Sequence, residues 1–533
     1  MSQSKEKNKT LVLGNEAAAL GAIHAGISAV YAYPGTPSTE VTEYIQGHPL
    51  AQSRQVKSTW CTNEKTAMEA ALGMSYVGKR ALVVMKHVGL NVAADAFVNS
   101  AMTGANGGLV VMVCDDPSMH SSQNEQDSRF YSKFAMVPTV EPSSQQEAYD
   151  IVRHAFELSE KVGLPVLLRM TTRLAHSRAA ITTSEILEEN EFHFPETPQQ
   201  WILLPAISRK RYKKLVEIQF ELGIESRKSL FNQYINGKDK SMGVIACGIA
   251  YNYLMETYPD GCPYPVYKIA QYPLDRTVLA TLTSEVAKVL VLEDGQPFVE
   301  EQLVGIMDTP IPVLGRLTGT LPRTGELTPD NVRAAFGFET EQYFDEADHV
   351  ASRPPALCTG CGHFDMYSDL NEVLTDYPDA KVFSDIGCYT LGALPPLRAI
   401  DSCVDMGASI TMARGAADGG LHPSVAVIGD STFTHSGMTG LLDAINVNAD
   451  MTVIISDNLT TAMTGGQPSA GTNKFEAICQ GLGLDPAHLH VVVPLPKNRE
   501  EIKRIMKQEI DYHGISVIIP RRDCIQQLVR VKK

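Results

Sequence analysis

Short apolar runs alternate with stretches of helical periodicity along most of this chain, and many of the runs end in glycine or a polar residue. This pattern is typical of parallel sheets covered by helices on both faces. In the first 175 residues it predicts strands at 29–33, 81–85, 109–114 and 165–170. Further strands are predicted at "MGVIACG", "VLVLED", "KVFSDIG", "SVAVIGD", "MTVIISDN" and "GISVIIPRR". We therefore expect a multidomain α/β fold with parallel sheets flanked by helices.

Changes in composition divide the chain into four segments. The strands of the first segment end near residue 175, and residues 176–239 are more polar, so we interpret them as a connecting segment. Residues 240–348 contain two of the strand candidates and have the size of a small α/β domain. The stretch "DEADHVASRPPALCTGCG" places charges and then Pro-Pro before a cysteine motif. Such a stretch marks a domain boundary, so we expect the last domain at 349–533.

The charge balance narrows the class of partner. The 533 residues carry a formal net charge of −15, and the calculated isoelectric point is about 5.4. An acidic chain is a poor candidate for a nucleic-acid-binding protein, because the protein surfaces that bind nucleic acids are usually basic. One basic run, "SRKRYKK" at 208–214, is explained by a solvated helix face.

The N-terminal segment, the hydropathy of the chain and its cysteines bear on the cellular compartment of the protein. The opening "MSQSKEKNKTLVLG" lacks the apolar core of a signal peptide, and no stretch reaches the ~18 continuous apolar residues of a membrane span. We expect a cytoplasmic protein that binds no membrane. The ten cysteines are then expected to be reduced thiols, ligands or core residues, not a disulfide framework.

Two polar residues in the last segment follow neighbouring strand candidates. Asp430 comes after "SVAVIG", and Asn458 ends "MTVIISDN", 28 residues later. The helix predicted between them brings both residues to the carboxyl edge of one sheet, where ligands bind. A carboxylate and an amide oxygen suit Mg²⁺, and the helix after Asp430 can offer N–H groups to a diphosphate. The alternative is that Gly-Asp forms only a turn.

"GDST" followed at this spacing by "DNLTTAMTGGQP" resembles the thiamine-diphosphate site of 2-oxoacid:ferredoxin oxidoreductases, and more narrowly the α subunit of the indolepyruvate type. The resemblance extends through "YPGTPSTE", "NEKTAMEAALG", "MKHVGLNVAADAF", "DDPSMHSSQNEQDSRF", "CTGCGH", "SDIGCYTLG" and "CVDMGASI", which span nearly the whole chain. It implies a pyrimidine-binding domain at 1–175, a small transketolase-C-like domain at 240–348 and a diphosphate-binding domain at 349–533.

The resemblance also implies roles for residues. Asp430, Asn458 and the Thr460 carbonyl would bind Mg²⁺, while the diphosphate would be approached by Gly387, Gly429 and Ser431.

In the first domain, Glu64 would share a proton with the aminopyrimidine, and Thr36 would border the reacting carbon. His87 and His435 are candidates for the same pocket, either binding the substrate carboxylate or moving a proton. Without the resemblance, Glu64 would be interpreted as a charge in the first turn of a helix capped by Asn63. A histidine is more often structural than catalytic, so that alternative stays open for both histidines.

The motif "CTGCGHF" at 358–364 allows three interpretations: half of a zinc site, a redox dithiol, or one corner of an iron–sulfur cluster. A zinc site needs four ligands, usually in two close pairs, and the chain has no second C-x-x-C. A thioredoxin-like dithiol would follow a strand, which "SRPPAL" is not. The resemblance implies a [4Fe–4S] cluster held by Cys358, Cys361, Cys388 and Cys524. Cys479 is the competitor for the fourth position.

The remaining cysteines are expected to be mostly core residues; they are Cys61, Cys114, Cys247, Cys262 and Cys403.

The activity implied by the resemblance is oxidative decarboxylation of a 2-oxoacid, with coenzyme A taking the acyl group. The motif "KHVGLN" resembles the arylpyruvate branch, which favours an aromatic substrate such as indolepyruvate. The family commonly carries a C-terminal ferredoxin-like domain with tandem C-x-x-C-x-x-C runs, whereas this chain has no such run and ends nine residues after Cys524. Electrons are therefore expected to leave through another subunit or a carrier such as ferredoxin.

A smaller β subunit is the expected partner, in a hetero-oligomer. Two other functions remain as alternatives: a non-redox thiamine-dependent 2-oxoacid decarboxylase, and a non-catalytic assembly subunit.

Overall fold

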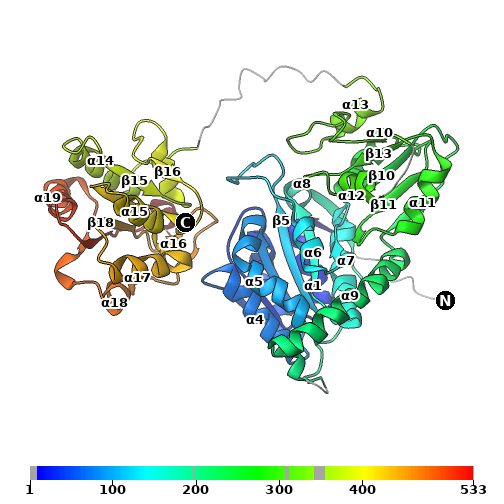
Figure 1. Cartoon of the computed structure of the whole chain (residues 1–533), viewed down its shortest axis with the longest axis horizontal. Helices are drawn as coiled ribbons and strands as arrows, with labels where there is room; N and C mark the ends of the chain where they lie inside the picture. The colour runs from blue at the N-terminus through cyan, green and yellow to red at the C-terminus, as the bar shows by residue number, and fades with distance from the viewer. Residues whose placement is uncertain (1–8, 196–197, 307–310, 341–354, 532–533) are drawn as a thin grey trace. The chain divides into compact units, whose positions relative to one another are not determined.

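The computed structural model describes residues 9–195, 198–306, 311–340 and 355–531. The chain forms two compact units, Met1–Tyr343 and Phe344–Lys533, called here the N-terminal unit and the C-terminal unit. Figure 1 shows the elements of each. All ten strand candidates of the sequence are confirmed as strands, with ends shifted by at most a few residues. Among the described residues, no helix has both the length and the apolar character that crossing a membrane requires.

The N-terminal unit is built on a seven-stranded sheet in the order β12-β6-β7-β5-β4-β2-β3. Its strands are β2 (Ala29–Ala32), β3 (Lys57–Trp60), β4 (Ala81–Lys86), β5 (Leu109–Asp115), β6 (Thr139–Val140), β7 (Val166–Thr171) and β12 (Gln271–Tyr272). All neighbours pair in parallel except β12, which pairs antiparallel to β6. Every residue of β4, β5 and β7 is buried, because helices cover both faces of the sheet.

The helices of this sheet pack in two groups. Helices α4 (Glu64–Tyr76) and α5 (His87–Thr103) pack on each other and on the central strands, and α1 (Gly14–His24) packs against α2 (Thr39–Gly47) and α7 (Gln145–Val162). The other short elements are α3 (Pro49–Ser53), α6 (Ser128–Ala135), α8 (Thr172–His176) and the antiparallel pair β1 (Lys9–Leu13) and β8 (Arg178–Thr182). The basic run 208–214 lies on the long helix α9 (Pro205–Lys228), mostly exposed as expected.

A second, five-stranded sheet has the order β14-β13-β10-β11-β9. It consists of β9 (Gln233–Ile235), β10 (Gly243–Cys247), β11 (Val266–Ile269), β13 (Val289–Leu292) and β14 (Val313–Leu314), with helices α10 (Ile249–Thr257), α11 (Arg276–Glu285), α12 (Phe298–Ile306) and α13 (Pro329–Ala335). Two strands pair with a sheet on the other side of the boundary expected at residues 239–240 or of the small domain as a whole. β9, from the connecting segment, joins this sheet, and β12, from within 240–348, joins the first sheet.

Two buried arginines join the two sheets inside the N-terminal unit. Arg169 on β7 donates to Asp115 Oδ2 at 2.6 Å and to the carbonyl of Asp294, which follows β13, at 2.9 Å. Arg129 donates to Asp127 Oδ1 and to Glu293 Oε2, each at 2.9 Å. Because a buried charge left without its partner destabilises a fold strongly, these pairs fix the small sheet against the large one.

The C-terminal unit contains a six-stranded, all-parallel sheet in the order β16-β15-β17-β18-β22-β21. The strands are β15 (Lys381–Ser384), β16 (Ser402–Cys403), β17 (Ser424–Gly429), β18 (Met451–Ser456), β21 (Leu489–Val492) and β22 (Ile515–Pro520). Side chains alternate between two cores: Val425 and Val427 face one core, and Ala426 and Ile428 face the other.

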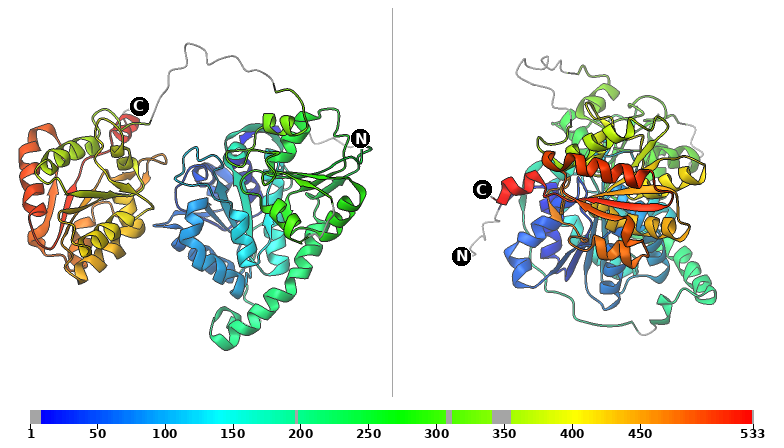
Figure 2. Two further views of the ribbon diagram at one scale, coloured as in Figure 1. Left: turned by 45° about the horizontal axis from the view of Figure 1, so that its top comes forward. Right: turned by 90° about the vertical axis from the view of Figure 1, so that its left-hand side faces the viewer.

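Helices cover both faces of this sheet (Figure 2). One layer consists of α14 (Gly362–Leu374) and α19 (Arg499–Ile510), and the other of α15 (Ala408–Asp418), α17 (Met438–Asn446) and α18 (Phe475–Gly481). The carboxyl edge carries α16 (Asp430–Thr432), a π-helical turn at Phe433–Gly437, the hairpin β19 (Thr460–Thr461) and β20 (Gln467–Pro468), and α20 (Ile525–Val531). β17 and β18, the strands before Asp430 and Asn458, are parallel neighbours that end at this edge, as the sequence predicted.

Candidate functional site

The oxygens of Asp430 and Asn458 converge on one backbone amide in the C-terminal unit. Thr460 N donates to Asp430 Oδ2 at 3.0 Å and lies 3.2 Å from Asn458 Oδ1. The two side chains follow the adjacent strands β17 and β18, so the sheet itself brings them together. Leu459, between Asn458 and Thr460, has a φ of 65°, a left-handed conformation that turns the chain back toward Asp430.

The environment of Asp430 suits a cation. The residue is 4% exposed, and its carboxylate accepts from the backbone amides of Ser431 and Thr460. Among the described residues no Lys or Arg side chain forms an ion pair with it. Burial, and then the charge of Asp457, raise the pKa of Asp430 to about 7. A buried carboxylate without a counter-charge, beside an amide oxygen, is a donor set that fits Mg²⁺.

His363 determines which way the Asn458 amide faces. Its ring is 4% exposed; Nε2 lies 3.1 Å from Asn458 Nδ2, and Nδ1 lies 2.5 Å from Ser456 Oγ. Burial lowers the pKa of His363 to about 4, so the ring is neutral at physiological pH. Since the amide nitrogen only donates, Nε2 accepts and Nδ1 carries the proton. Asn458 Oδ1 is thereby directed away from the histidine, toward Thr460 N.

Gly387 and Gly429 make room for an aromatic ring. A Cβ on Gly387 would lie 2.3 Å from the Tyr389 ring, and a Cβ on Gly429 would lie 2.4 Å from it. Tyr389 is buried and donates its hydroxyl to Asp385. Ser431, at the start of α16, forms a 2.7 Å hydrogen bond with the hydroxyl of Thr461. The glycines therefore have a packing role in addition to the diphosphate approach expected for them.

Asp385 holds two of the sequence motifs together, a role that the sequence did not indicate. Its Oδ2 accepts from Ser409 Oγ at 2.6 Å and from the amide of Gly407 at 3.2 Å, linking "SDIGCYTLG" to "CVDMGASI". The residue is fully buried, and burial raises its pKa to about 6. This contact fixes the turn that carries Cys388.

Four cysteines line one cavity in the C-terminal unit. The cavity has a volume of about 130 Å³, and its walls include Cys358, Cys361, Cys388, Cys524 and also Asn458. Burial first, and then the charges of the other three thiols and of Asp430, raise the pKa of Cys388 to about 12. Four thiolates at this place need a cation to compensate their charge.

Within the described residues, the four cysteines do not meet the close spacing that a single zinc ion requires. A tetrahedral zinc site would hold its sulfurs roughly 3.8 Å apart, because Zn–S bonds are about 2.3 Å long. Within the described chain, the three-residue metal-ligand set whose donor atoms lie within 4.8 Å of one another does not contain these cysteines. Four cysteines around one cavity are the kind of donor set that holds a [4Fe–4S] centre.

Cys479, the competitor for the fourth position, lies elsewhere. It is fully buried on α18 within the core that contains Phe475, and it is absent from the cavity wall. Of the cysteines expected in the core, Cys114 and Cys247 are buried, and Cys61 and Cys262 are half-buried. The expectation is wrong for Cys403, which is exposed at the end of the edge strand β16.

The predicted residues of the N-terminal unit follow three neighbouring strands. Thr36 follows β2, His87 follows β4 and Glu64 follows β3 by four residues. Glu64 is 5% exposed at the first position of α4, where Asn63 caps the helix by accepting from Thr66 N at 2.9 Å. The capping interpretation is therefore correct, but Glu64 is not a solvated charge. A Cβ on Gly89 of α5 would lie 2.5 Å from its Oε1, so that glycine makes room for the carboxylate.

His87 lies buried at the first position of α5. Its Nε2 lies 3.2 Å from the Asn124 carbonyl, and its Nδ1 has no hydrogen-bond partner among the described residues. Beside it, Lys86 donates to the carbonyl of Ser121 at 2.6 Å, and Ser121 Oγ lies 3.4 Å from the carbonyl of Thr36. Burial lowers the pKa of Lys86 to about 8. Lys86 is therefore linked to Thr36 through Ser121 and adjoins His87; its place at a strand end was the only signal for it in the sequence.

His435 is in the C-terminal unit, in the π-helical turn after α16. It is 4% exposed, and its Nδ1 lies 2.6 Å from Ser436 Oγ. π-Helical turns inside helices occur frequently at functional sites. The predicted site residues are thus divided between the units: Thr36, Glu64 and His87 lie in the first, and Asp430, Asn458, the four cysteines and His435 lie in the second.

Comparison with known proteins matches both units. The family model described as "Pyruvate flavodoxin/ferredoxin oxidoreductase, thiamine diP-bdg" matches residues 20–214, and "Thiamine pyrophosphate enzyme, C-terminal TPP binding domain" matches residues 385–519. The chain is 37% identical to indolepyruvate oxidoreductase subunit IorA of Archaeoglobus fulgidus, over 97% of this chain and 87% of that protein. It is 38% identical to the subunit of that name from Pyrococcus abyssi, over 99% and 88%.

One solved structure supports the fold. It is the 2-oxoglutarate:ferredoxin oxidoreductase from Magnetococcus marinus, solved with 2-oxoglutarate, coenzyme A and succinyl-CoA bound. The TM-score is 0.51 at 16% identity, covering 63% of this chain and 66% of that one. At this identity the similarity establishes a common α/β architecture, as the sequence predicted.

Proposed function

This chain belongs to the family of indolepyruvate oxidoreductase subunits named IorA, and from that premise we propose that it catalyses the thiamine-diphosphate-dependent oxidative decarboxylation of a 2-oxoacid. In the overall reaction a 2-oxoacid anion and coenzyme A give an acyl-CoA, carbon dioxide, one proton and two electrons. The observation that supports this most strongly is the cavity lined by four cysteines and by Asn458, since it joins an electron-transfer donor set to a metal–diphosphate donor set.

The Mg²⁺ ligands in this proposal are the Asp430 carboxylate, Asn458 Oδ1 and the Thr460 carbonyl. The convergence of the two side chains on Thr460 N supports it. Gly387, Gly429 and Ser431 approach the diphosphate, and the start of the helix after Asp430 adds N–H groups directed at negative charge. Residues 1–175 bind the pyrimidine and 349–533 the diphosphate, with the transketolase-C-like domain at 240–348.

Bound thiamine diphosphate supplies the carbanion that adds to the ketone and the conjugated system that holds the electrons left by carbon dioxide. Glu64 shares a proton with the aminopyrimidine. Its burial beside Gly89 supports this role, because general acid–base catalysis needs a carboxyl group held in a fixed position. Thr36 borders the reacting carbon, and His87 and His435 bind the substrate carboxylate or move a proton.

Cys358, Cys361, Cys388 and Cys524 would hold a [4Fe–4S] cluster, which would supply a one-electron carrier for the two electrons. The acceptor is ferredoxin or a cluster-bearing subunit, and a smaller β subunit completes a hetero-oligomer. The substrate class is the arylpyruvates, with indolepyruvate as the first candidate; the names of the relatives and the "KHVGLN" segment support it.

The deciding experiment measures iron and acid-labile sulfide per chain in anaerobically purified protein, with EPR spectra after dithionite reduction. About four irons and a reduced-cluster signal are the expected result. Iron-free protein that still binds thiamine diphosphate would favour the non-redox decarboxylase. Protein that binds neither would favour the non-catalytic assembly subunit.

A further inference from the structure

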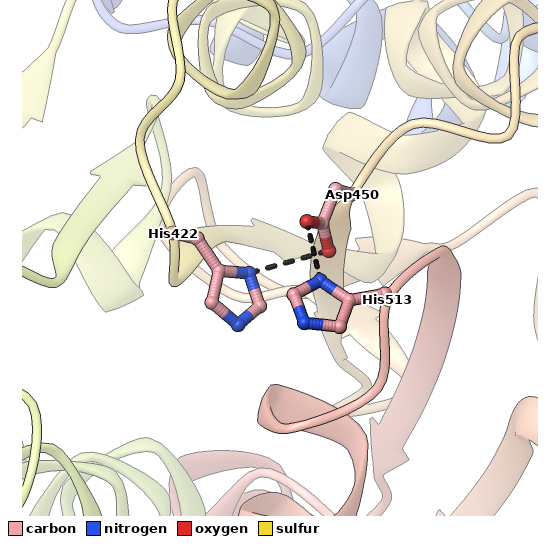
Figure 3. A group of neighbouring side chains, drawn as sticks. All are labelled: His422, Asp450 and His513. Carbon is pink, nitrogen blue, oxygen red and sulfur yellow. Dashed lines mark hydrogen bonds and ion pairs between the residues drawn. The ribbon is translucent and has the colours of Figure 1, made fainter.

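Two histidines and an aspartate meet at the amino edge of the C-terminal sheet (Figure 3). Each residue comes just before a strand: His422 before β17, Asp450 before β18 and His513 before β22. These three strands are neighbours in the sheet, so residues 28 and 63 positions apart in sequence lie side by side. Each strand has six residues, which places this group about 20 Å from the cysteines and Asp430 at the opposite edge.

The two imidazoles face the two oxygens of one carboxylate. His422 Nδ1 lies 3.2 Å from Asp450 Oδ1, and His513 Nδ1 lies 2.8 Å from Asp450 Oδ2. The rings lie against each other, with centroids 4.5 Å apart and planes inclined by 27°. One donor atom from each residue lies within 4.8 Å of the donor atoms of the other two.

One pair in this group is unsatisfied. His422 Nδ1 and Asp450 Oδ1 are both shielded from solvent, and within the described chain neither atom makes a hydrogen bond of acceptable geometry, although they face each other. Buried polar atoms without a partner are costly, and in native proteins they usually have an ion or water between them. In a tetrahedral site with bonds of roughly 2.0–2.1 Å, donor atoms are about 3.3 Å apart, close to the 3.2 Å of this pair.

A second group of two histidines and a carboxylate in the same unit provides a contrast. His488 Nδ1 and His490 Nε2 lie 2.9 and 2.7 Å from the two oxygens of the buried Glu509. Among the described residues, each carboxylate oxygen of that group has an ordinary hydrogen bond to one histidine. The donor atoms of that group do not all lie within 4.8 Å of one another, as the atoms of a metal site would. The unsatisfied, convergent geometry is therefore a particular property of the His422 group.

We propose that His422, Asp450 and His513 bind a divalent transition-metal ion of the Zn²⁺ class through both Nδ1 atoms and the Asp450 carboxylate. Ions of this class favour a donor set of two imidazoles and one carboxylate, whereas Mg²⁺ prefers oxygen ligands. The His513 side chain is 76% exposed, so the remaining coordination position is open to water. The ion links the N-terminal ends of β17, β18 and β22 and so stabilises the C-terminal unit.

The site is tested on the full-length, tag-free chain, purified anaerobically so that its iron content is retained. The chain is stripped of adventitious metal and titrated with Co²⁺ and Zn²⁺. Co²⁺ held by nitrogen and oxygen gives weak d–d absorption, whereas Co²⁺ on cysteines adds intense thiolate charge-transfer bands, so the spectrum separates the two places. His513→Ala and Asp450→Asn are the test variants: the first residue is exposed, and the second substitution keeps the side-chain shape.

His490→Gln is the matched control, because it alters a histidine–carboxylate pair of the same unit while leaving a donor for Glu509. We expect one Co²⁺ per chain without charge-transfer bands, at least a tenfold weaker affinity in both test variants, and an unchanged affinity in the control. Zn²⁺ should raise the unfolding temperature of the wild-type chain and not of His513→Ala. Binding only with thiolate bands, or binding that both test variants leave unchanged, would overturn the proposal.

Discussion

The ring of His363 accepts a hydrogen bond from the side-chain amide of Asn458, with 3.1 Å between Nε2 and Nδ2, and so fixes the direction of the Asn458 oxygen. His363 is the last polar residue of the "CTGCGHF" motif, whose two cysteines line the neighbouring cavity. One short motif thus supplies two thiols and the residue that orients a predicted magnesium ligand. Because the ring is buried and neutral, this orientation does not depend on pH in the physiological range.

His363→Ala should weaken Mg²⁺-dependent binding of thiamine diphosphate by roughly 10–100-fold, the usual effect of losing a residue that orients a metal ligand. Calorimetric titration of the cofactor at several Mg²⁺ concentrations measures it. If His363 only positions Asn458, a high Mg²⁺ concentration should restore binding of thiamine diphosphate to His363→Ala. His490→Gln is the control, and an unchanged Mg²⁺ dependence in His363→Ala would contradict the role.

Asp430→Ala should abolish Mg²⁺-dependent binding of thiamine diphosphate, since it removes the anionic member of the proposed donor set. Asp443→Ala, an exposed aspartate on the nearby helix α17, is the matched control. Cofactor binding by equilibrium dialysis with and without Mg²⁺ distinguishes the two variants. Retained Mg²⁺-dependent binding in Asp430→Ala would show that the metal assignment is wrong.

Glu64→Gln should leave cofactor binding intact and reduce turnover by about 10²–10⁴-fold, the range for losing a general acid–base. Glu69→Gln serves as control, because Glu69 lies on the same helix but is exposed and pairs with Lys65. The measurement is 2-oxoacid-dependent reduction of a viologen dye together with cofactor affinity. Turnover near the wild-type level in Glu64→Gln refutes the catalytic role.

Cys524→Ser should lower the iron content of the chain, while Cys479→Ser should leave iron unchanged and lower stability. The first thiol lines the cavity with Cys358, Cys361 and Cys388, and the second lies in the hydrophobic core. Iron analysis and thermal unfolding on both variants test this pair. The reverse pattern would assign the fourth ligand to Cys479.

The stability of the N-terminal unit should fall as the pH decreases from about 6.5 to 4, in part through His24. Burial first, and then the charges of His48 and Arg54, lower the pKa of His24 to about 4. A base whose pKa is lower in the folded chain than in the unfolded chain contributes full stability above its unfolded pKa of about 6.5 and loses it as the pH falls toward 4.

His24→Gln should therefore show a smaller decrease in unfolding free energy over this range than the wild type. Glutamine can still bond to the Tyr149 hydroxyl, which lies 2.7 Å from His24 Nδ1. Urea unfolding followed by tryptophan fluorescence reports on this unit, because both tryptophans, Trp60 and Trp201, lie in it. Parallel pH profiles for the two proteins would exclude His24 as a source of acid sensitivity.

The sequence predicted the sheets well because their strands are buried on both faces and appear as continuous apolar runs. It located Asp430, Asn458, Cys388 and Cys524 near strand ends for the same reason: parallel strands in one sheet end at one edge. It did not indicate how β9 and β12 pair, because these strands are only two or three residues long and their sheet membership depends on pairing across the chain. It also misjudged Cys403, whose exposure follows from the place of β16 at the sheet edge.

By itself, then, the sequence determined the α/β class, the order of strands and helices, and the residue types available at each strand end, since these depend on local periodicity and composition. Only the tertiary structure decided which of those residues meet. Strand order and register made neighbours of β17, β18 and β22, and this brought His422, Asp450 and His513 together at one edge. Packing of α14 on the sheet placed His363 against Asn458. Such contacts join residues far apart in the chain, and local sequence patterns do not encode them.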